Sequence, residues 1–167
     1  MLYAILMTSN EQARYLIENN QHMTIATSDR EGNPWVSPVF FAPDDDFNLY
    51  WVSSKQAQHS RNLRFRPQVS IVIFGTVPPD NRLDGVYIQA EASELHQRHD
   101  IATAMAVLAL RPQPEKFTIS RDSDVMGINT WRIYQAVPLE VTKRADAVDD
   151  WTKQAITVRE PVNLTES

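Results

Sequence analysis

The residues best suited to chemistry lie in one stretch of the chain that contains no acidic side chain. Residues 47–79 hold no aspartate or glutamate, although the chain has 21 acids in 167 residues and an even spread would place about four of them there. The same window contains five cationic or titratable side chains: Lys55, His59, Arg61, Arg64 and Arg66. Within it, Ser53 and Ser54 end an apolar run just before a short predicted helix. Hydroxyls, cations and the free amides of a helix start together suit a phosphate group. The alternative is a solvated basic helix face.

Other kinds of reactive site find less support in the sequence. His96 and His99 are three residues apart and could share a metal on a helix, but no third ligand is evident, so we expect no metal site. His59 and Ser60 are adjacent, and adjacent residues on a helix do not face each other, so hydrolase chemistry is not expected. The chain has no cysteine, which excludes thiolate and disulfide chemistry. Its four glycines lie at least ten residues apart, which excludes the glycine-rich nucleotide-binding loops. Redox work would therefore need a borrowed cofactor.

Length and charge limit the organisation of the chain and its partners. We expect one domain over residues 1–167, because 167 residues suffice for one hydrophobic core. A net charge of -5 argues against nucleic acid and anionic lipid as partners. The longest apolar stretch, Ile101–Leu110, has about half of the ~20 residues that a membrane span needs. Residues 1–10 lack the basic start of an export signal, so a cytoplasmic protein is expected.

The elements that must position these residues follow from hydrophobic periodicity and turn signals. Helices are predicted over 9–20 and 97–110, with a short one between 54 and 68. Strands are predicted over 23–27, 35–41, 47–53, 68–77, 86–92 and 128–142, with a short terminal one over 156–158. Residues 111–126 are expected to be irregular, and 145–167 to be a docking arm or a loose tail. Strands with helices inserted between them predict an α+β, mainly β domain built on a barrel or a strongly curled sheet.

Three segments in order carry a resemblance to a known family. They are Leu49-Tyr50-Trp51-Val52-Ser53, Ala57-Gln58-His59-Ser60-Arg61-Asn62-Leu63 and Pro67-Gln68-Val69-Ser70. In order and spacing the chain resembles the pyridoxamine 5'-phosphate oxidase-like FMN-binding split β-barrels, from the opening helix to about Arg144. The resemblance implies a six-stranded antiparallel split β-barrel with Greek-key connections and flanking helices. It also implies a homodimer that holds two FMN molecules at the subunit interface.

The resemblance assigns roles to particular residues. Ser53 and Ser54 correspond to hydroxyl donors, and His59 and Arg61 to cations that bind the phosphate. Ala57 and Gln58 depart from the family pattern, where serine and arginine are usual, which leaves Lys55 as a substitute cation. The strand around Pro38 corresponds to backbone along the flavin ring, and Tyr134 to an aromatic from the partner subunit that covers the flavin edge. The full set of expected cofactor-binding residues is Ser37, Pro38, Val39, Val52, Ser53, Ser54, Lys55, His59, Ser60, Arg61, Trp131 and Tyr134.

The function that the resemblance implies is that of an FMN-dependent oxidoreductase acting on a small, undefined molecule. True pyridoxamine phosphate oxidases have an arginine and a lysine where this chain has Ser37 and Ala42, and an R-x-H type motif where it has residues 137–140, so vitamin B6 oxidation is not expected. The alternatives are a protein for deazaflavin F420 or heme, and a non-catalytic flavin store or sensor. Heme is the less suited, because no histidine follows His99.

A bound phosphate also sets an expectation for pH dependence. A phosphate carries about -1.5 to -2 charges at pH 7, so the pKa of a neighbouring His59 should rise above its ordinary value of about 6.5. FMN binding should then weaken as the pH rises through that titration.

Overall fold

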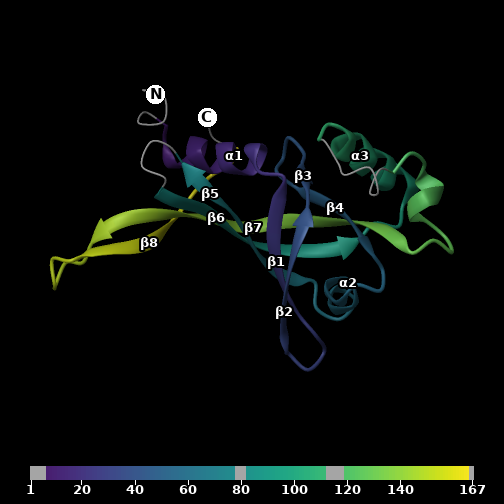
Figure 1. Ribbon diagram of the computed structural model, residues 1–167, viewed down its shortest axis with the longest axis horizontal. Coiled ribbons are helices and arrows are strands. Elements are labelled where there is room, and N and C mark those ends of the chain that lie inside the picture. Colours follow the sequence, from purple (N-terminus) through teal and green to yellow (C-terminus); the bar gives the residue numbers. More distant parts are fainter. Residues whose placement is uncertain (1–6, 78–81, 112–118, 166–167) are drawn as a thin grey trace.

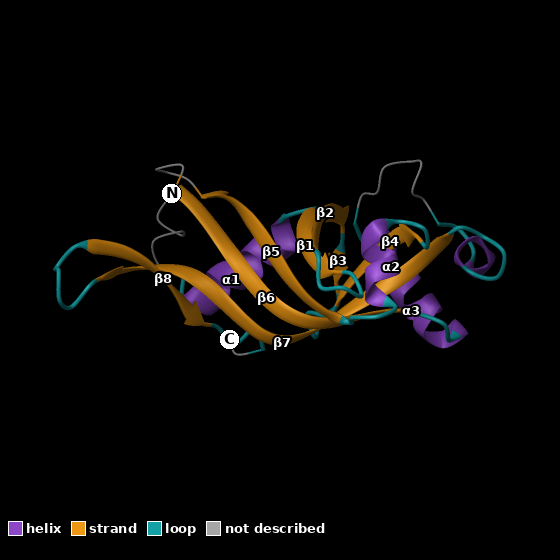
Figure 2. Cartoon of the chain, turned by 90° about the horizontal axis from the view of Figure 1, so that it is seen from below, coloured by secondary structure: helices purple, strands orange, loops and turns teal. Residues whose placement is uncertain are grey.

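In the part of the chain that the structure describes, three α-helices lie on the faces and at the ends of a single curled antiparallel sheet (Figures 1 and 2). The computed structural model describes residues 7–77, 82–111 and 119–165. Its helices are α1 (Ser9–Asn19), α2 (Gln58–Leu63), α3 (Arg98–Ala109) and the 3₁₀ helix η3 (Asp122–Val125). Its strands are β1 (His22–Ser28), β2 (Pro34–Phe40), β3 (Ala42–Pro43), β4 (Leu49–Ser54), β5 (Gln68–Val77), β6 (Arg82–Glu94), β7 (Trp131–Val148) and β8 (Ala155–Pro161). The predicted mainly β character is confirmed.

The order of the strands in the sheet brings distant parts of the sequence together. The order is β2-β1-β5-β6-β7-β4-β3, and β8 pairs with the far end of β7. Strands β5, β6 and β7 follow one another as neighbours, while β4 returns to lie beside β7, which is a Greek-key arrangement. Because of this connection, β4 and the start of β7 lie side by side, and the segment from Ser53 into α2 meets the loop before Trp131.

Alternating side chains build the hydrophobic core on one face of the sheet. On β1, Met23 and Ile25 are buried while their neighbours are partly exposed, and β6 repeats this pattern with Ile88 and Ala90. Helix α1 covers this face with Leu16 and its apolar neighbours. It begins at Ser9, as predicted, and its N-cap Thr8 forms a capping box with Glu11.

The expected count of six strands is wrong, because the described residues form eight. Strand β3 is a two-residue pairing beside β4 that follows the second hairpin strand too closely to show in a hydrophobic pattern. Strand β7 runs to Val148, six residues beyond the predicted end at residue 142, because β8 pairs with its extension over Thr142–Val148. The short strand predicted over 156–158 is confirmed and is longer, spanning seven residues.

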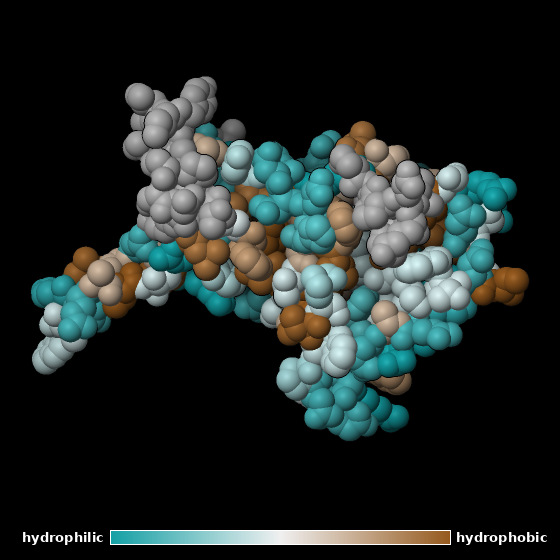
Figure 3. Space-filling model, in the orientation of Figure 1, coloured by the Kyte–Doolittle hydropathy of each residue, from teal (hydrophilic) through white to brown (hydrophobic). Residues whose placement is uncertain are grey.

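The C-terminal region forms a hairpin and a docked end. The paired ends of β7 and β8 project from the body of the molecule (Figures 1 and 2). Figure 3 shows apolar side chains gathered on this projection, among them Val148 and Val158. After β8 the chain returns to α1, where Leu164 is buried in the core and its carbonyl accepts a hydrogen bond from Arg14. The alternative of a loose tail is therefore wrong for the described part of 145–167.

Three segments discussed from the sequence lie where the structure gives no description. The apolar residues 1–6, the loop 78–81 and residues 112–118 lie outside the described residues. Among the described helices, none has the length and hydropathy needed to cross a membrane.

Candidate functional site

Helix α2 places His59 between two strands, β2 and β4, that lie near opposite ends of the strand order in the sheet. The His59 Nε2 atom lies 2.9 Å from the Ser53 hydroxyl at the end of β4, and Nδ1 lies 3.1 Å from the Ser37 hydroxyl on β2. The Trp35 indole N–H donates to the same Ser37 oxygen at 3.0 Å. Three expected site residues, Ser37, Ser53 and His59, therefore form one hydrogen-bonded cluster, with Trp35 as a fourth member that sequence analysis did not assign to the site.

Burial governs the electrostatics of this cluster. His59 is 7% exposed and Ser53 is equally buried, whereas Ser37 is half-buried. Desolvation lowers the pKa of His59 below its ordinary value, because a buried imidazolium loses hydration. The raised pKa expected from the sequence concerns His59 beside a bound phosphate, and it stays a prediction.

Short polar side chains fix α2 against the sheet and so fix His59. The buried Asn62 amide donates to the Thr27 hydroxyl on β1 at 3.0 Å, and the Gln58 amide donates to the Asn62 oxygen at 2.8 Å. Arg61 lies on the exposed side of this short helix, where its guanidinium donates to the Gln58 side chain. The structure therefore does not bring Arg61 to the cluster around His59. The departure from the family pattern at Gln58 has a structural use, since Gln58 holds both Asn62 and Arg61.

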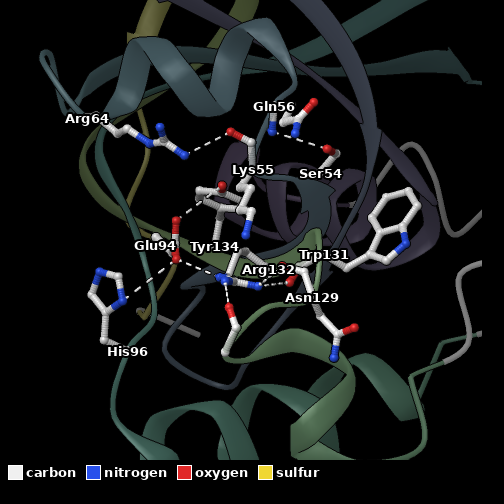
Figure 4. Close-up of polar contacts among 11 residues, drawn as sticks. Ser54, Lys55, Gln56, Arg64, Glu94, His96, Asn129, Trp131, Arg132 and Tyr134 are labelled. Atoms are coloured by element: carbon white, nitrogen blue, oxygen red, sulfur yellow. Dashed lines mark hydrogen bonds and ion pairs between the residues drawn. The ribbon is translucent and has the colours of Figure 1, made fainter.

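The turn between β4 and α2 presents Ser54 and Lys55 beside the start of β7 (Figure 4). The Ser54 hydroxyl accepts a hydrogen bond from the backbone N–H of Gln56 at 3.1 Å. The Arg64 guanidinium donates to the backbone carbonyl of Lys55 at 2.9 Å. The Lys55 amide donates to the carbonyl of Thr130, which ties this turn to the loop before β7. In Figure 4 the Lys55 side chain points toward the pair formed by Glu94 and Arg132. Lys55 is the substitute cation expected from the sequence, and the half-buried position of this side chain beside Ser54 is compatible with that role.

Glu94 and Arg132 form an ion pair that sequence analysis missed. The Arg132 Nε atom lies 3.0 Å from the Glu94 carboxylate, and both side chains are largely buried. The remaining guanidinium nitrogens donate to the carbonyls of Gly127, Asn129 and Trp131, so Arg132 shapes the loop that leads into β7 (Figure 4). A charged residue inside the otherwise apolar run 131–134 was the available signal. Trp131, an expected site residue, lies opposite Ser54 across the β4–β7 ladder and is 40% exposed.

Tyr134 does not occupy the position expected of an aromatic that covers a flavin. It is 1% exposed and stacks on the fully buried Trp51, with ring centroids 5.5 Å apart. Its hydroxyl donates to Glu94 at 3.5 Å, and burial raises its pKa. We correct the expectation accordingly: within this chain Tyr134 is a core residue that also supports Glu94.

The remaining expected residues are spread over the edges of the cluster. Pro38 is exposed on β2 and Val39 points into the core, as alternation along a strand requires. Val52 is partly buried against α3 and its surroundings. Ser60 is buried, and its hydroxyl has no hydrogen-bond partner of normal geometry among the described residues.

The chemistry that this arrangement offers is anion binding. It offers hydroxyl donors and one half-buried ammonium group at the start of a helix, which are the groups that hold an anion. In the part of the chain that the structure describes, no three histidine, aspartate or glutamate side chains come together as a metal site.

Comparison with known proteins places this site in a wider group. The family described as Pyridoxamine 5'-phosphate oxidase has a sequence profile that matches residues 9–135, which include every strand and helix of the site up to the start of β7. No curated protein sequence matches the chain.

Several solved structures share the fold at low sequence identity. The heme binding protein from Mycobacterium smegmatis is 19% identical with a TM-score of 0.64, and the match covers 91% of this chain and 58% of that one. HutZ, the heme storage protein from Vibrio cholerae, is 18% identical with a TM-score of 0.62, covering 81% and 94%. A FAD-binding protein from Mesorhizobium loti is 16% identical with a TM-score of 0.62, covering 82% and 94%. This chain thus spans 58% of the length of the first of these proteins. Likeness at these identities concerns the fold.

Proposed function

The chain belongs to the pyridoxamine 5'-phosphate oxidase family, and on that premise we propose that it binds FMN in a split-barrel homodimer and uses it in redox chemistry on a small molecule. The observation that carries the proposal is the convergence of Ser37, Ser53 and His59 at the turn that presents Ser54 and Lys55. This turn lies inside the family match, at the segment to which the resemblance assigns the phosphate.

The donors at this turn fit the phosphate of FMN. Ser53 and Ser54 supply hydroxyls, and the Lys55 ammonium supplies a positive charge. His59 holds Ser53 in place through a hydrogen bond. Lys55 forms no ion pair with any described residue, so its charge is available to a ligand, whereas Arg132 is committed to Glu94. A bound flavin supplies the redox chemistry, and the chain binds and orients it. The substitutions at Ser37 and Ala42 continue to argue against vitamin B6 as substrate.

We assign the second copy of the homodimer to the outer face of the sheet, opposite to the face that Ser37 and Ser53 share with the core. That face carries a groove of about 400 Å³ to which six strands contribute, lined in part by Val36, Val72 and Tyr87. Val36 on β2 and Leu139 on β7 are more than half exposed. A second copy covering this face should bury at least about 1,600 Å² in total. Sedimentation or size-exclusion measurements at several concentrations test this, and a persistent monomer would remove the second half of the cofactor site.

The colour of the purified protein is the most direct test of the cofactor. A flavin spectrum, or saturable quenching of added FMN, supports the proposal, and a colourless protein that ignores FMN in titration defeats it. Bleaching by NADH or NADPH without oxygen would distinguish an enzyme from a flavin store or sensor. A deazaflavin spectrum would point instead to F420.

Heme is the second candidate because two of the similar structures are heme proteins by name. The buried histidine of the described chain is His59, and both of its ring nitrogens are engaged by serine hydroxyls. The other three histidines, His22, His96 and His99, are exposed, and the His96 ring lies 3.7 Å from the Glu94 carboxylate. Iron coordination would therefore need a rearranged site, and a Soret band on addition of hemin would reveal it.

A further inference from the structure

The unusual feature of the site is that a buried serine hydroxyl has a histidine nitrogen as its hydrogen-bond partner. Among the described residues, Ser53 Oγ has one such partner, the Nε2 atom of His59 at 2.9 Å. A hydroxyl has one proton to donate, and a neutral imidazole has one nitrogen that donates and one that accepts. The direction of the Ser53–His59 bond therefore depends on which ring nitrogen carries the proton.

The surroundings of the two serines differ enough to choose a direction. Ser53 is buried, so its proton needs an acceptor within the protein, and the acceptor in reach is Nε2. Ser37 is half-buried, so its own proton can go to water while its oxygen accepts from both Trp35 and the Nδ1–H of His59. This assignment satisfies every member of the cluster. The reverse assignment would leave the buried Ser53 proton without an acceptor.

We infer that His59 couples anion binding to proton uptake by reversing its hydrogen bond to Ser53. In the free chain, neutral His59 carries its proton on Nδ1 and accepts the Ser53 proton at Nε2. When Nε2 takes a proton from solvent, it becomes the donor to Ser53, and the Ser53 hydroxyl is released to donate to a phosphate oxygen. The idea deepens the proposed function, on which it rests for the nature of the anion, and its first test needs no flavin.

No charged side chain contacts the His59 ring among the described residues, so a bound anion can change its protonation. The ring makes its described polar contacts to hydroxyls alone, and burial is the cause of its lowered pKa. Two groups of ionisable residues surround α2. On the neighbouring strands they are His22, Tyr50, Asp84, Tyr87, Glu91 and Glu94, and on the segment that contains α2 they are Lys55, Arg61, Arg64 and Arg66. Of these, Glu94 is paired with Arg132 and Asp84 with Lys143, while Tyr50 has a pKa of about 12 and stays neutral.

The first experiment is ¹⁵N NMR of the flavin-free full-length chain labelled at histidine, with His59 assigned through the variant His59→Gln. Above the titration of His59 we expect a protonated Nδ1 and an unprotonated Nε2. A protonated Nε2 in the neutral form would overturn the inference, whatever FMN does.

The second experiment repeats the titration with inorganic phosphate as the probe. We expect the His59 midpoint to move to higher pH as phosphate is added and both nitrogens to be protonated in the complex. Ser53→Ala should abolish this shift, whereas Ser120→Ala, at an exposed serine outside the site, should keep it. A midpoint that ignores phosphate, or an equal shift in Ser53→Ala, would contradict the coupling. Failure of FMN to bind in a parallel titration would count against the proposed function alone.

Discussion

Trp51 on β4 and Tyr134 on β7 stack face to face in the core, with ring centroids 5.5 Å apart and ring planes 20° from parallel. They occupy paired positions of the β4–β7 ladder, so the stack ties the strand that ends at Ser53 to the strand that begins at Trp131. Such aromatic pairs are worth about 0.5–1.5 kcal/mol beyond the area that they bury. The candidate site therefore rests directly on this pair.

Truncation of Tyr134 should destabilise the fold rather than act on a cofactor. Tyr134→Ala should lower the free energy of unfolding by about 3–5 kcal/mol, because it leaves a large cavity against Trp51. Tyr134→Phe should cost less than about 1 kcal/mol, since the contact from its hydroxyl to Glu94 is long at 3.5 Å. Urea denaturation of the three proteins measures this. A strong loss of FMN affinity in a stable Tyr134→Phe protein would restore the role that the resemblance implied.

The lowered pKa of His59 should make the free protein less stable in mild acid. The unfolded chain binds a proton at about pH 6.5, while the folded chain binds it only at lower pH, so stability falls as the pH drops below about 6.5. His59→Gln should flatten this part of the stability profile. Thermal unfolding between pH 5 and 8 measures it, with His99→Gln on the exposed side of α3 as the control. Parallel profiles for the parent and His59→Gln would contradict the assignment.

FMN affinity should show the opposite dependence on pH from stability. A bound phosphate favours the protonated imidazole, so affinity should decline as the pH rises through the titration of His59 in the complex. His59→Lys carries a charge throughout this range and should show a flat profile. Fluorescence titrations of FMN across neutral pH provide the comparison. If FMN affinity changed equally with pH in the parent and in His59→Lys, the titration of His59 would not be the cause.

The ion pair between Asp84 and Lys143 holds the root of the projecting hairpin. The two groups lie 2.9 Å apart, with side chains 10% and 6% exposed. Asp84→Ala should cost about 3–5 kcal/mol of unfolding free energy, because it leaves the Lys143 ammonium buried without its partner. The matched control is Asp146→Ala, which removes a half-exposed acid from the neighbouring Arg144 and should cost about 1 kcal/mol or less. Similar losses of unfolding free energy in both variants would show that the Lys143 ammonium becomes hydrated when Asp84 is removed.

The sequence predicted the elements of this fold well, and the exceptions have physical causes. Strand alternation and turn residues placed β1, β5 and β6 to within a few residues, because each buries one face. The end of β7 and the length of β8 escaped prediction, since both depend on pairing between two largely exposed strands rather than on burial. Local pattern carries little information about such a hairpin.

The site was predictable where residue types matter and unpredictable where orientation matters. The pattern around Ser53 and His59 marked them from sequence, and the structure joins them. The helix face taken by Arg61 and the burial of Tyr134 follow from how α2 and β7 pack, which residue type does not encode. Ser37 joined His59 only once β2 and α2 were placed in space.

Lys55, on the turn before α2, and Arg61, within α2, should contribute unequally to FMN binding. Lys55 lies on the turn beside Ser54 without an ion-pair partner among the described residues, while Arg61 points to solvent and is engaged by Gln58. Lys55→Met should weaken FMN binding by roughly tenfold, the loss of one charge-assisted hydrogen bond, and should reduce its salt dependence. Arg61→Met makes the same change in net charge on the exposed side of α2, and should alter affinity less than about twofold. If the two variants weaken binding equally, the phosphate responds to the net charge of the region and Lys55 makes no direct contact with it.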